Sequence, residues 1–273
     1  MKAKEIRKSA REAMSGKWGR FVGMNLLLSA ISILAVVVVF TPMIISIGNM
    51  IINSDSGNTI DDSAALGMVG SLGITYLLYI ILILFIVPLA YAFLENLIKL
   101  KRDNNTKCTE FFGLIFKRFG RAWKVGLWCV LKILIIYLMF IAGLVAYIIL
   151  TSIFAALKVG ILIVILSILA IIGMIVFYVA IIVRFISLAL SQYIAIDNPD
   201  YLAKQCVDKS IELMKGYKWK YVCLSLSFIG WMLLSLLTLG IGLIFLYPYM
   251  QVSYICFYEK ICEEKGVVIT EKE

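Results

Sequence analysis

Two cationic side chains lie inside apolar runs of this sequence that contain no other charge: Lys132 and Arg184. A charged residue at the centre of a bilayer costs about 2.5–3.5 kcal/mol, so such residues often serve a function. Both lie near one end of their run, where a long side chain can extend to the lipid head groups. Three interpretations stay open: snorkelling anchors, members of a structural ion pair, or ligands for an anion or substrate.

Other polar residues fall in the same third of their predicted membrane spans. Glu95 stands beside Asn96, and we expect it to pair with Lys132 or Arg184 across a helical bundle. The ends of membrane spans are ordinarily polar, which is the simpler explanation. The alternative is a polar vestibule open to the cytoplasm, whose candidate residues are Glu95, Lys132, Arg184, Asn25, Asn96, Gln192 and Gln251.

Motifs for catalysis are missing from the sequence. It contains no histidine, so the usual acid–base group with a pKa near neutrality is absent. There is no nucleophile elbow, no phosphate-binding loop and no pair of acidic residues within one span. The six cysteines show no C-x-x-C spacing, and a four-cysteine zinc site would have to join scattered positions. We therefore predict no catalytic residue, no metal site and no cofactor.

Composition places the elements that carry these residues in a membrane. The chain is 62% hydrophobic and 16% charged, against about 45–50% and about 25% in soluble domains. Its apolar residues form blocks long enough to cross about 30 Å of hydrocarbon. We expect an uncleaved first span and six spans, at approximately 21–47, 68–97, 125–150, 159–194, 221–239 and 243–258.

The predicted fold is all-α, a polytopic helical membrane protein whose six transmembrane helices form three hairpins in one integral-membrane domain. The hairpin units cover about 1–100, 101–197 and 198–264. Lys and Arg concentrate in cytoplasmic segments near span ends. The segments before the first span, after the second, after the fourth and after the sixth contain 23 of the 26 basic residues. Both termini are therefore expected in the cytoplasm.

Each hairpin unit begins with an amphipathic stretch followed by an aromatic and basic cluster, which suggests a threefold repeat. The stretches, at about 3–15, 108–119 and 199–215, are predicted to lie in the membrane plane as interfacial helices. Asn198 and Pro199 suit the start of the third. Tryptophan beside Lys or Arg is typical of anchoring at the head groups, and the predicted interface anchors are Trp18, Trp123 and Trp219.

Glycines mark two further features. Gly240 and Gly242 predict a tight break between the last two spans. Gly67, Gly70 and Gly73 recur at a spacing of three, which favours close helix packing. The stretches AREAMSGKWGRFVG at 10–23 and MKGYKWKYVCLSLSFIGWMLLSLLTLGIGLIFLYPYMQVSYICFYEKI at 214–261 resemble a bacterial integral-membrane family, the domain of unknown function 975. The resemblance implies a bacterial cell membrane and brings no known activity. That family is distantly similar to membrane domains attached to glycerophosphodiester phosphodiesterases.

Two classes of function fit these observations. The first is a non-enzymatic membrane protein, either transport-like or an envelope-associated accessory subunit, with a possible protein partner in the membrane. The alternative is a protein that binds or handles phospholipid head groups, since the basic segments suit anionic lipids. The basic residues are spread over several segments and form no single patch, so no nucleic-acid partner is expected.

Overall fold

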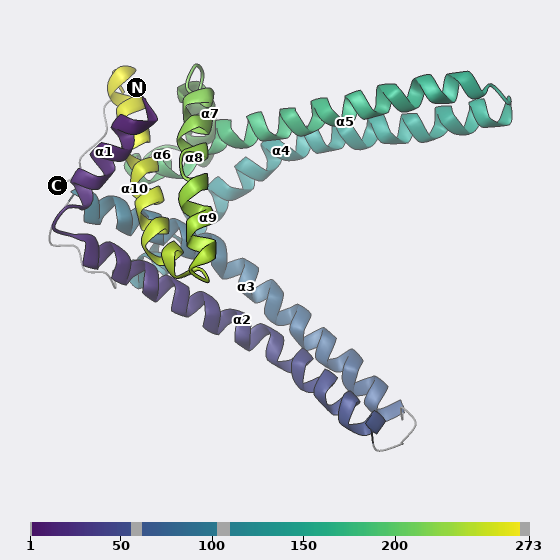
Figure 1. Ribbon diagram of the computed structural model, residues 1–273, viewed down its shortest axis with the longest axis horizontal. Helices are drawn as coiled ribbons and strands as arrows, with labels where there is room; N and C mark the ends of the chain where they lie inside the picture. Colours follow the sequence, from purple (N-terminus) through teal and green to yellow (C-terminus); the bar gives the residue numbers. More distant parts are fainter. Residues whose placement is uncertain (1, 56–61, 103–109, 268–273) are drawn as a thin grey trace. The chain divides into compact units, whose positions relative to one another are not determined.

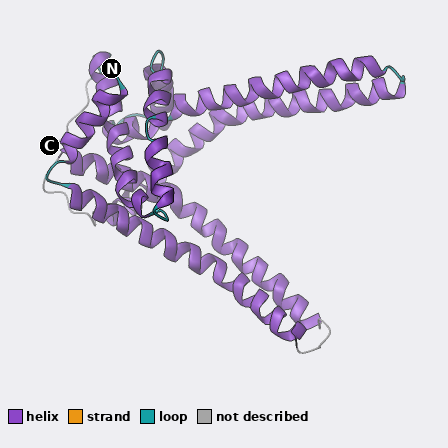
Figure 2. Ribbon diagram, viewed as in Figure 1, coloured by secondary structure: helices purple, strands orange, loops and turns teal. Residues whose placement is uncertain are grey.

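The computed structural model describes residues 2–55, 62–102 and 110–267. Every regular element in these ranges is an α-helix, and they contain no strand (Figures 1 and 2). This confirms the all-α prediction. The helices are α1 (Ala3–Met14), α2 (Trp18–Asp55), α3 (Asp62–Arg102), α4 (Phe111–Ala156), α5 (Gly160–Leu188), α6 (Ser191–Asp197), α7 (Ala203–Leu213), α8 (Lys218–Leu226), α9 (Ile229–Leu237) and α10 (Ile241–Glu264).

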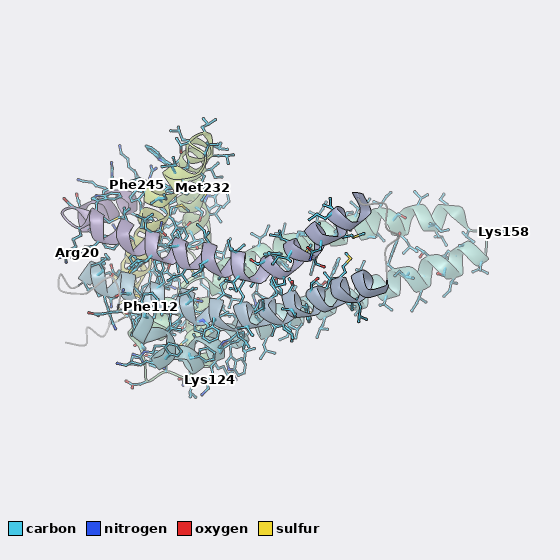
Figure 3. All side chains as sticks on the ribbon, turned by 90° about the horizontal axis from the view of Figure 1, so that it is seen from below. Arg20, Phe112, Lys124, Lys158, Met232 and Phe245 are labelled. Atoms are coloured by element: carbon cyan, nitrogen blue, oxygen red, sulfur yellow. The ribbon has the colours of Figure 1, made fainter. Side chains whose placement is uncertain are left out.

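Within the described residues, six helical segments are long and apolar enough to cross a membrane, as predicted. They are Trp18–Ile52, Leu66–Arg102, Phe112–Ala156, Gly160–Asp197, Lys218–Leu237 and Ile241–Glu264. Large apolar side chains stand exposed along most of these helices (Figure 3). Water-soluble monomers rarely expose such continuous apolar surface, so the outer surfaces of the long helices are suited to lipid.

The chain divides into two compact units. The first consists of Met1–Ser9, Gly120–Gly230 and Ser253–Glu273; the second consists of Ala10–Phe119 and Trp231–Val252. In the second unit α2 and α3 form a long hairpin with closely spaced backbones. In the first unit α4 and α5 form another long hairpin, with Lys158 at its tip (Figure 3), and α7 contacts α5 and α6.

Two helix starts differ from the sequence prediction. In the described part of the predicted stretch 108–119 there is no separate helix, because α4 runs without a break from Phe111 to Ala156. α7 begins at Ala203 instead of Pro199, and Gln205 Oε1 accepts the backbone N–H of Leu202, 2.8 Å away. The carbonyls of Asn198 and Pro199, which precede α7, accept hydrogen bonds from the Arg121 side chain of α4. The chain therefore turns before the helix begins.

The amphipathic faces of α1 and α7 also differ from expectation. Both segments are helical, but Ile6, Ala10 and Met14 of α1 are at most 2% exposed. Cys206 and Val207 of α7 are fully buried as well. These apolar faces therefore pack against protein and are not available to lie on lipid.

Only one of the two predicted glycine features is found. Leu239 and Gly240 have φ values of +52° and +86°, which makes the tight turn between α9 and α10. A Cβ on Gly242 would come within 2.9 Å of Ser235 Cα, so glycine is required there. By contrast, a Cβ on Gly67, Gly70 or Gly73 would meet no atom within 4 Å. The prediction of close helix packing at these three glycines was therefore wrong.

Candidate functional site

Lys132 of α4 forms an ion pair in the first unit. Its Nζ lies 2.9 Å from Oδ1 of Asp208 on α7. One turn earlier on α4, Trp128 makes a cation–π contact with Lys204 of α7, whose Nζ lies 5.7 Å from the ring centroid. The lysine and carboxylate are both partly exposed, so this pair orients the side chains and contributes about 1 kcal/mol or less to stability. The ion-pair interpretation of Lys132 is the one that matches these contacts.

Arg184 of α5 lies at the same level of the hairpin as Lys132. The helices are antiparallel, and the rings of Phe140 and Phe177 stack between them with centroids 3.7 Å apart. Arg184 is seven residues after Phe177, and Lys132 is eight residues before Phe140. Because the helices are antiparallel, the two cations lie at nearly the same distance along the hairpin from the stacked rings. Arg184 Nε is buried and has no hydrogen-bond partner among the described residues.

The cations Lys132, Arg184 and Lys204 therefore lie at one end of the α4–α5 hairpin. Of the side chains described there, only Asp208 is a carboxylate. We call this set the cation cluster: Lys132, Arg184, Lys204 and Asp208. A guanidinium is a planar donor that matches phosphate and carboxylate oxygens. An unpaired buried donor is unfavourable, so an anion at Arg184 would be stabilised there.

An apolar groove begins one helical turn from the cation cluster. It lies between α4 and α5 and has a volume of about 630 Å³, within the range of about 300–1,000 Å³ found for ligand sites. Ile136 and Ala180 line its end nearest the cluster, one turn from Lys132 and Arg184 respectively. Its floor includes small residues, namely Gly143, Ala146, Ala170 and Gly173. The backbones of α4 and α5 are not closely spaced like those of α2 and α3, which leaves this groove open.

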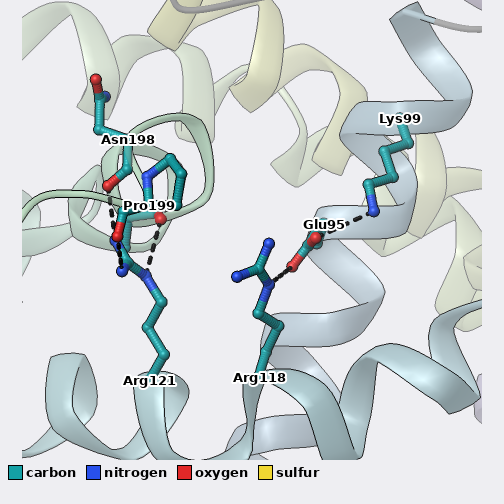
Figure 4. A network of polar contacts seen from close by, with 7 residues as sticks. Glu95, Lys99, Arg118, Arg121, Asn198 and Pro199 are labelled. Carbon is teal, nitrogen blue, oxygen red and sulfur yellow. Dashed lines mark hydrogen bonds and ion pairs between the residues drawn. The ribbon is translucent and has the colours of Figure 1, made fainter. Parts of the chain in front are cut away.

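Glu95 makes its ion pairs within the second unit (Figure 4). Its side chain is only 4% exposed, with Oε1 3.1 Å from Lys99 Nζ and Oε2 3.4 Å from Arg118 Nε. Glu95 therefore has two cationic partners in its own unit, and the expected pairing with Lys132 or Arg184 of the other unit stays a prediction. Lys99 is one turn after Glu95 on the same helix, an arrangement that stabilises helices.

Arg121 of α4 caps the turn after α6 in the first unit (Figure 4). Its guanidinium donates to four backbone carbonyls that follow or end that helix: those of Ala195, Asn198, Pro199 and Tyr201. Carbonyls at a helix C-terminus lack intrahelical partners, and a cation there is further favoured by the helix dipole. This contact explains why 198–202 form a turn.

The other candidate vestibule residues divide between the two units. In the second unit, Asn25 Nδ2 donates to Ile244 O at 3.0 Å. Proline at 248 has no N–H to offer that carbonyl, so Asn25 replaces the missing helical bond. Asn96 is fully buried and its Nδ2 lies 3.1 Å from Met24 Sδ. Gln251 of the second unit and Gln192 of the first are half-buried.

A smaller cavity of about 510 Å³ lies beside Asn25 in the second unit. Ser29, Ser32 and Gly240 also line it, and no charged residue does. The hydroxyl of Ser32 donates to Leu28 O within its own helix. The cavity therefore offers a few neutral polar groups, and the vestibule hypothesis remains a prediction.

The three predicted anchors lie in different environments. Trp219 is 73% exposed and Trp18 is 38% exposed, whereas Trp123 is half-buried. Trp18 packs against Tyr249, with ring centroids 6.3 Å apart. Of the three, Trp219 has the exposure that a head-group anchor requires.

Described cysteines form no metal site. Cys129, Cys206, Cys223, Cys256 and Cys262 form no disulfide within the described residues, and Cys108 lies outside them. No group of three or more Cys, Asp or Glu side chains in the described ranges could hold a metal ion. Burial raises the pKa of the Cys206 thiol, which disfavours the thiolate that metals bind.

Sequence inspection missed four residues that matter to this geometry: Asp208, Lys204, Arg118 and Arg121. The spacing of Glu95 and Lys99 was a usable local signal. The other pairings join residues up to 80 positions apart, so neither periodicity nor charge counting reveals them.

A family model described as a protein of unknown function (DUF975) matches residues 1–265. No curated protein and no solved structure matches the chain. The match extends well beyond the two stretches on which the resemblance was first seen. The chain therefore belongs to the DUF975 family of proteins of unknown function.

Proposed function

We propose that this protein is a non-enzymatic membrane protein that binds an anionic phospholipid between α4 and α5. The observation that carries the proposal is the position of the cation cluster one helical turn from an apolar groove. A phospholipid has the same arrangement, with a phosphate directly above acyl chains. The further link to glycerophosphodiester metabolism suggested by sequence has no support in these contacts.

The phosphate would bind at Arg184. Lys132 is already paired with Asp208, and Lys204 lies over the ring of Trp128. By contrast, Arg184 Nε has no hydrogen-bond partner among the described residues. Charge-assisted bonds from a guanidinium to a phosphate contribute about 1.5–3 kcal/mol. Lys204 would add a second positive charge to the head-group end.

One acyl chain would lie in the groove. Its lining is almost entirely hydrocarbon, and the absence of a side chain at Gly143 and Gly173 leaves its depth open. Because a lipid bilayer already surrounds α4 and α5, the groove itself gives little selectivity for an acyl chain. Selectivity for this lipid class comes from the cation cluster.

The location of the site follows from the charge pattern. We propose a bacterial cell membrane with both termini in the cytoplasm, since Lys and Arg favour that side. The cation cluster then lies at the cytoplasmic leaflet, where anionic lipids create a negative surface potential. A transport role has less support, because the polar cavity near Asn25 has no charged lining residue.

Native mass spectrometry of the purified full-length protein tests the proposal. The protein is exchanged into detergent containing phosphatidylglycerol or phosphatidylcholine, and the retained lipid is counted. We expect a preference for phosphatidylglycerol that Arg184→Gln lowers about tenfold, which corresponds to about 1.4 kcal/mol. Lys158→Gln is the matched control, because it removes one charge at the other end of the same hairpin.

Equal retention of the two lipids by the unaltered protein would contradict the proposal. Equal losses in the Arg184 and Lys158 variants would also contradict it, because that result indicates attraction by net charge without a site. Circular dichroism and thermal unfolding of both variants establish that the comparison is made between folded proteins.

A further inference from the structure

The α9–α10 hairpin has an unusual tip. Its turn is formed by Thr238, Leu239 and Gly240 and contains no charge. Leu237 is 84% exposed, Leu239 is 94% exposed and Ile241 is 62% exposed. Turns that face water are normally polar, so an apolar tip requires an apolar environment.

The backbone N–H groups of Leu239, Gly240 and Ile241 are bonded within this turn. Gly240 N donates to Ser235 O at 3.0 Å, and Leu239 N donates to Leu236 O at 3.1 Å. Thr238 Oγ1 donates to Ser235 O and accepts the N–H of Gly242. Hydrocarbon excludes a turn with unsatisfied polar groups. The bonded N–H groups at this tip are in keeping with that requirement.

Contacts within the second unit fix how far the hairpin extends along α2. Tyr249 of α10 contacts Trp18, and Ile244 accepts a hydrogen bond from Asn25. Gly240 then lines the same cavity as Ser32 and Ile33. The tip of the hairpin therefore lies level with Ser32 and Ile33 along the axis of α2.

α2 continues well beyond the tip. From Ile33 to Ile52 it has 20 further residues, about 30 Å at 1.5 Å per residue, and exposed apolar side chains recur along this stretch. In the partner helix, exposed apolar side chains recur from Leu66 to Ile86, whereas residues 91–98 are buried. The stretch of α2 beyond the tip is therefore longer than one leaflet is thick, since the whole hydrocarbon layer is about 30 Å.

We infer that the α9–α10 hairpin does not cross the membrane: its apolar tip inserts into the lipid leaflet on the side where the chain termini lie. The occupant of this apolar surface is the acyl-chain region of that leaflet. α2 and α3 cross the full bilayer. Exposed apolar side chains on α2 begin at Leu26 and Leu27, before the level of the tip, so the tip lies within the hydrocarbon. The segments Lys218–Leu237, which includes α8 and α9, and Ile241–Glu264 each have the length and hydropathy of a span. The register of the hairpin against α2 limits its depth.

The distribution of basic residues is compatible with this arrangement. The connection between α9 and α10 has no Lys or Arg, so charge counting gives the same orientation whether the hairpin crosses or returns. A hairpin that returns also leaves both ends of the chain on one side. The inference is independent of the proposed lipid site in the first unit.

Electron paramagnetic resonance in lipid nanodiscs tests the inference. A noncanonical ketone residue at Leu239 carries the spin label and leaves the six native cysteines in place. A second label is placed at Ile33 or at Met50 of α2. We expect the distance from 239 to 50 to exceed the distance from 239 to 33 by about 25 Å, the rise of 17 helical residues.

Relaxation by oxygen and by an aqueous nickel complex gives the environment of the same label. We expect the label at 239 to be relaxed by oxygen and protected from nickel, with a label at Lys158 as the water-exposed control. A shorter distance to 50 than to 33 would overturn the inference, because the hairpin would then cross. Nickel access equal to that at 158 would also overturn it, because the tip would then lie in water. Leu237 provides a second labelling position if the first disturbs folding.

Discussion

The hairpins α2–α3 and α4–α5 are both long and apolar, yet they are built differently. The backbones of α2 and α3 are closely spaced, and the carboxylate near the base of α3 is compensated by Lys99 and Arg118. α4 and α5 are bridged by aromatic side chains, of which Phe140 and Phe177 are stacked. They leave a groove of about 630 Å³ between them.

The difference teaches that equal hydropathy does not imply equal packing. A closely packed hairpin offers lipid only its outer surface, whereas a hairpin held open by aromatic side chains offers a concave surface. Only the open hairpin, within the described residues, combines its groove with a cation whose Nε has no hydrogen-bond partner. Glu95→Gln and Gly173→Leu test this contrast, whereas Arg121→Gln and Gly242→Ala test other contacts of the two units. The four are given in order of expected effect on stability.

Arg121→Gln is expected to have the largest effect. Arg121 donates to the carbonyls of Ala195, Asn198, Pro199 and Tyr201, and hydrogen bonds from charged groups contribute about 1.5–3 kcal/mol each, without full additivity. We expect a loss of about 3 kcal/mol in the free energy of unfolding, measured by denaturant titration. Lys124→Gln on the exposed face of the same helix is the control, and equal losses would contradict the capping role.

Gly242→Ala is expected to have the next largest effect. The added Cβ would lie 2.6 Å from Ser235 Oγ and 2.9 Å from its Cα, and overpacking of this kind costs about 1–3 kcal/mol. The measurement is the midpoint of thermal unfolding in detergent. An unchanged midpoint would show that α9 and α10 do not approach closely at this glycine.

Glu95→Gln tests the base of the closely packed hairpin. The amide keeps the shape of the carboxylate but removes the charge that faces Lys99 and Arg118. Both cations are partly exposed and can turn to water, so we expect a loss of only about 1 kcal/mol. Denaturant titration at low and high salt measures it, and a loss that is independent of salt would contradict an electrostatic origin.

Gly173→Leu should have the smallest effect on stability and a clear effect on lipid. A Cβ at Gly173 would meet no atom within 4 Å, and leucine favours helix over glycine by up to about 1 kcal/mol. We expect unchanged or raised thermal stability, with about tenfold weaker retention of phosphatidylglycerol because the side chain fills the groove. Gly70→Leu, on the closely packed hairpin, is the control and should leave lipid retention unchanged.

Sequence reasoning recovered the elements but not their contacts. Apolar block length identified the six candidate segments, and Gly240 identified the α9–α10 turn, because both are local properties. The Lys132–Asp208 pair and the Arg121 cap join residues more than 70 positions apart, which no local pattern encodes. The apolar faces of α1 and α7 suited lipid or protein equally, since helical periodicity does not name what covers a face.

Photocrosslinking with a phosphatidylglycerol that carries a diazirine in its acyl chain tests the central claim most directly. The full-length protein is irradiated in nanodiscs, and the modified peptides are identified by mass spectrometry. We expect modification to concentrate on the groove residues of α4 and α5, with a reduction in Arg184→Gln and none in Lys158→Gln. Equal modification of the α2–α3 hairpin, unchanged by Arg184→Gln, would contradict a lipid site and show that both hairpins contact only bulk lipid.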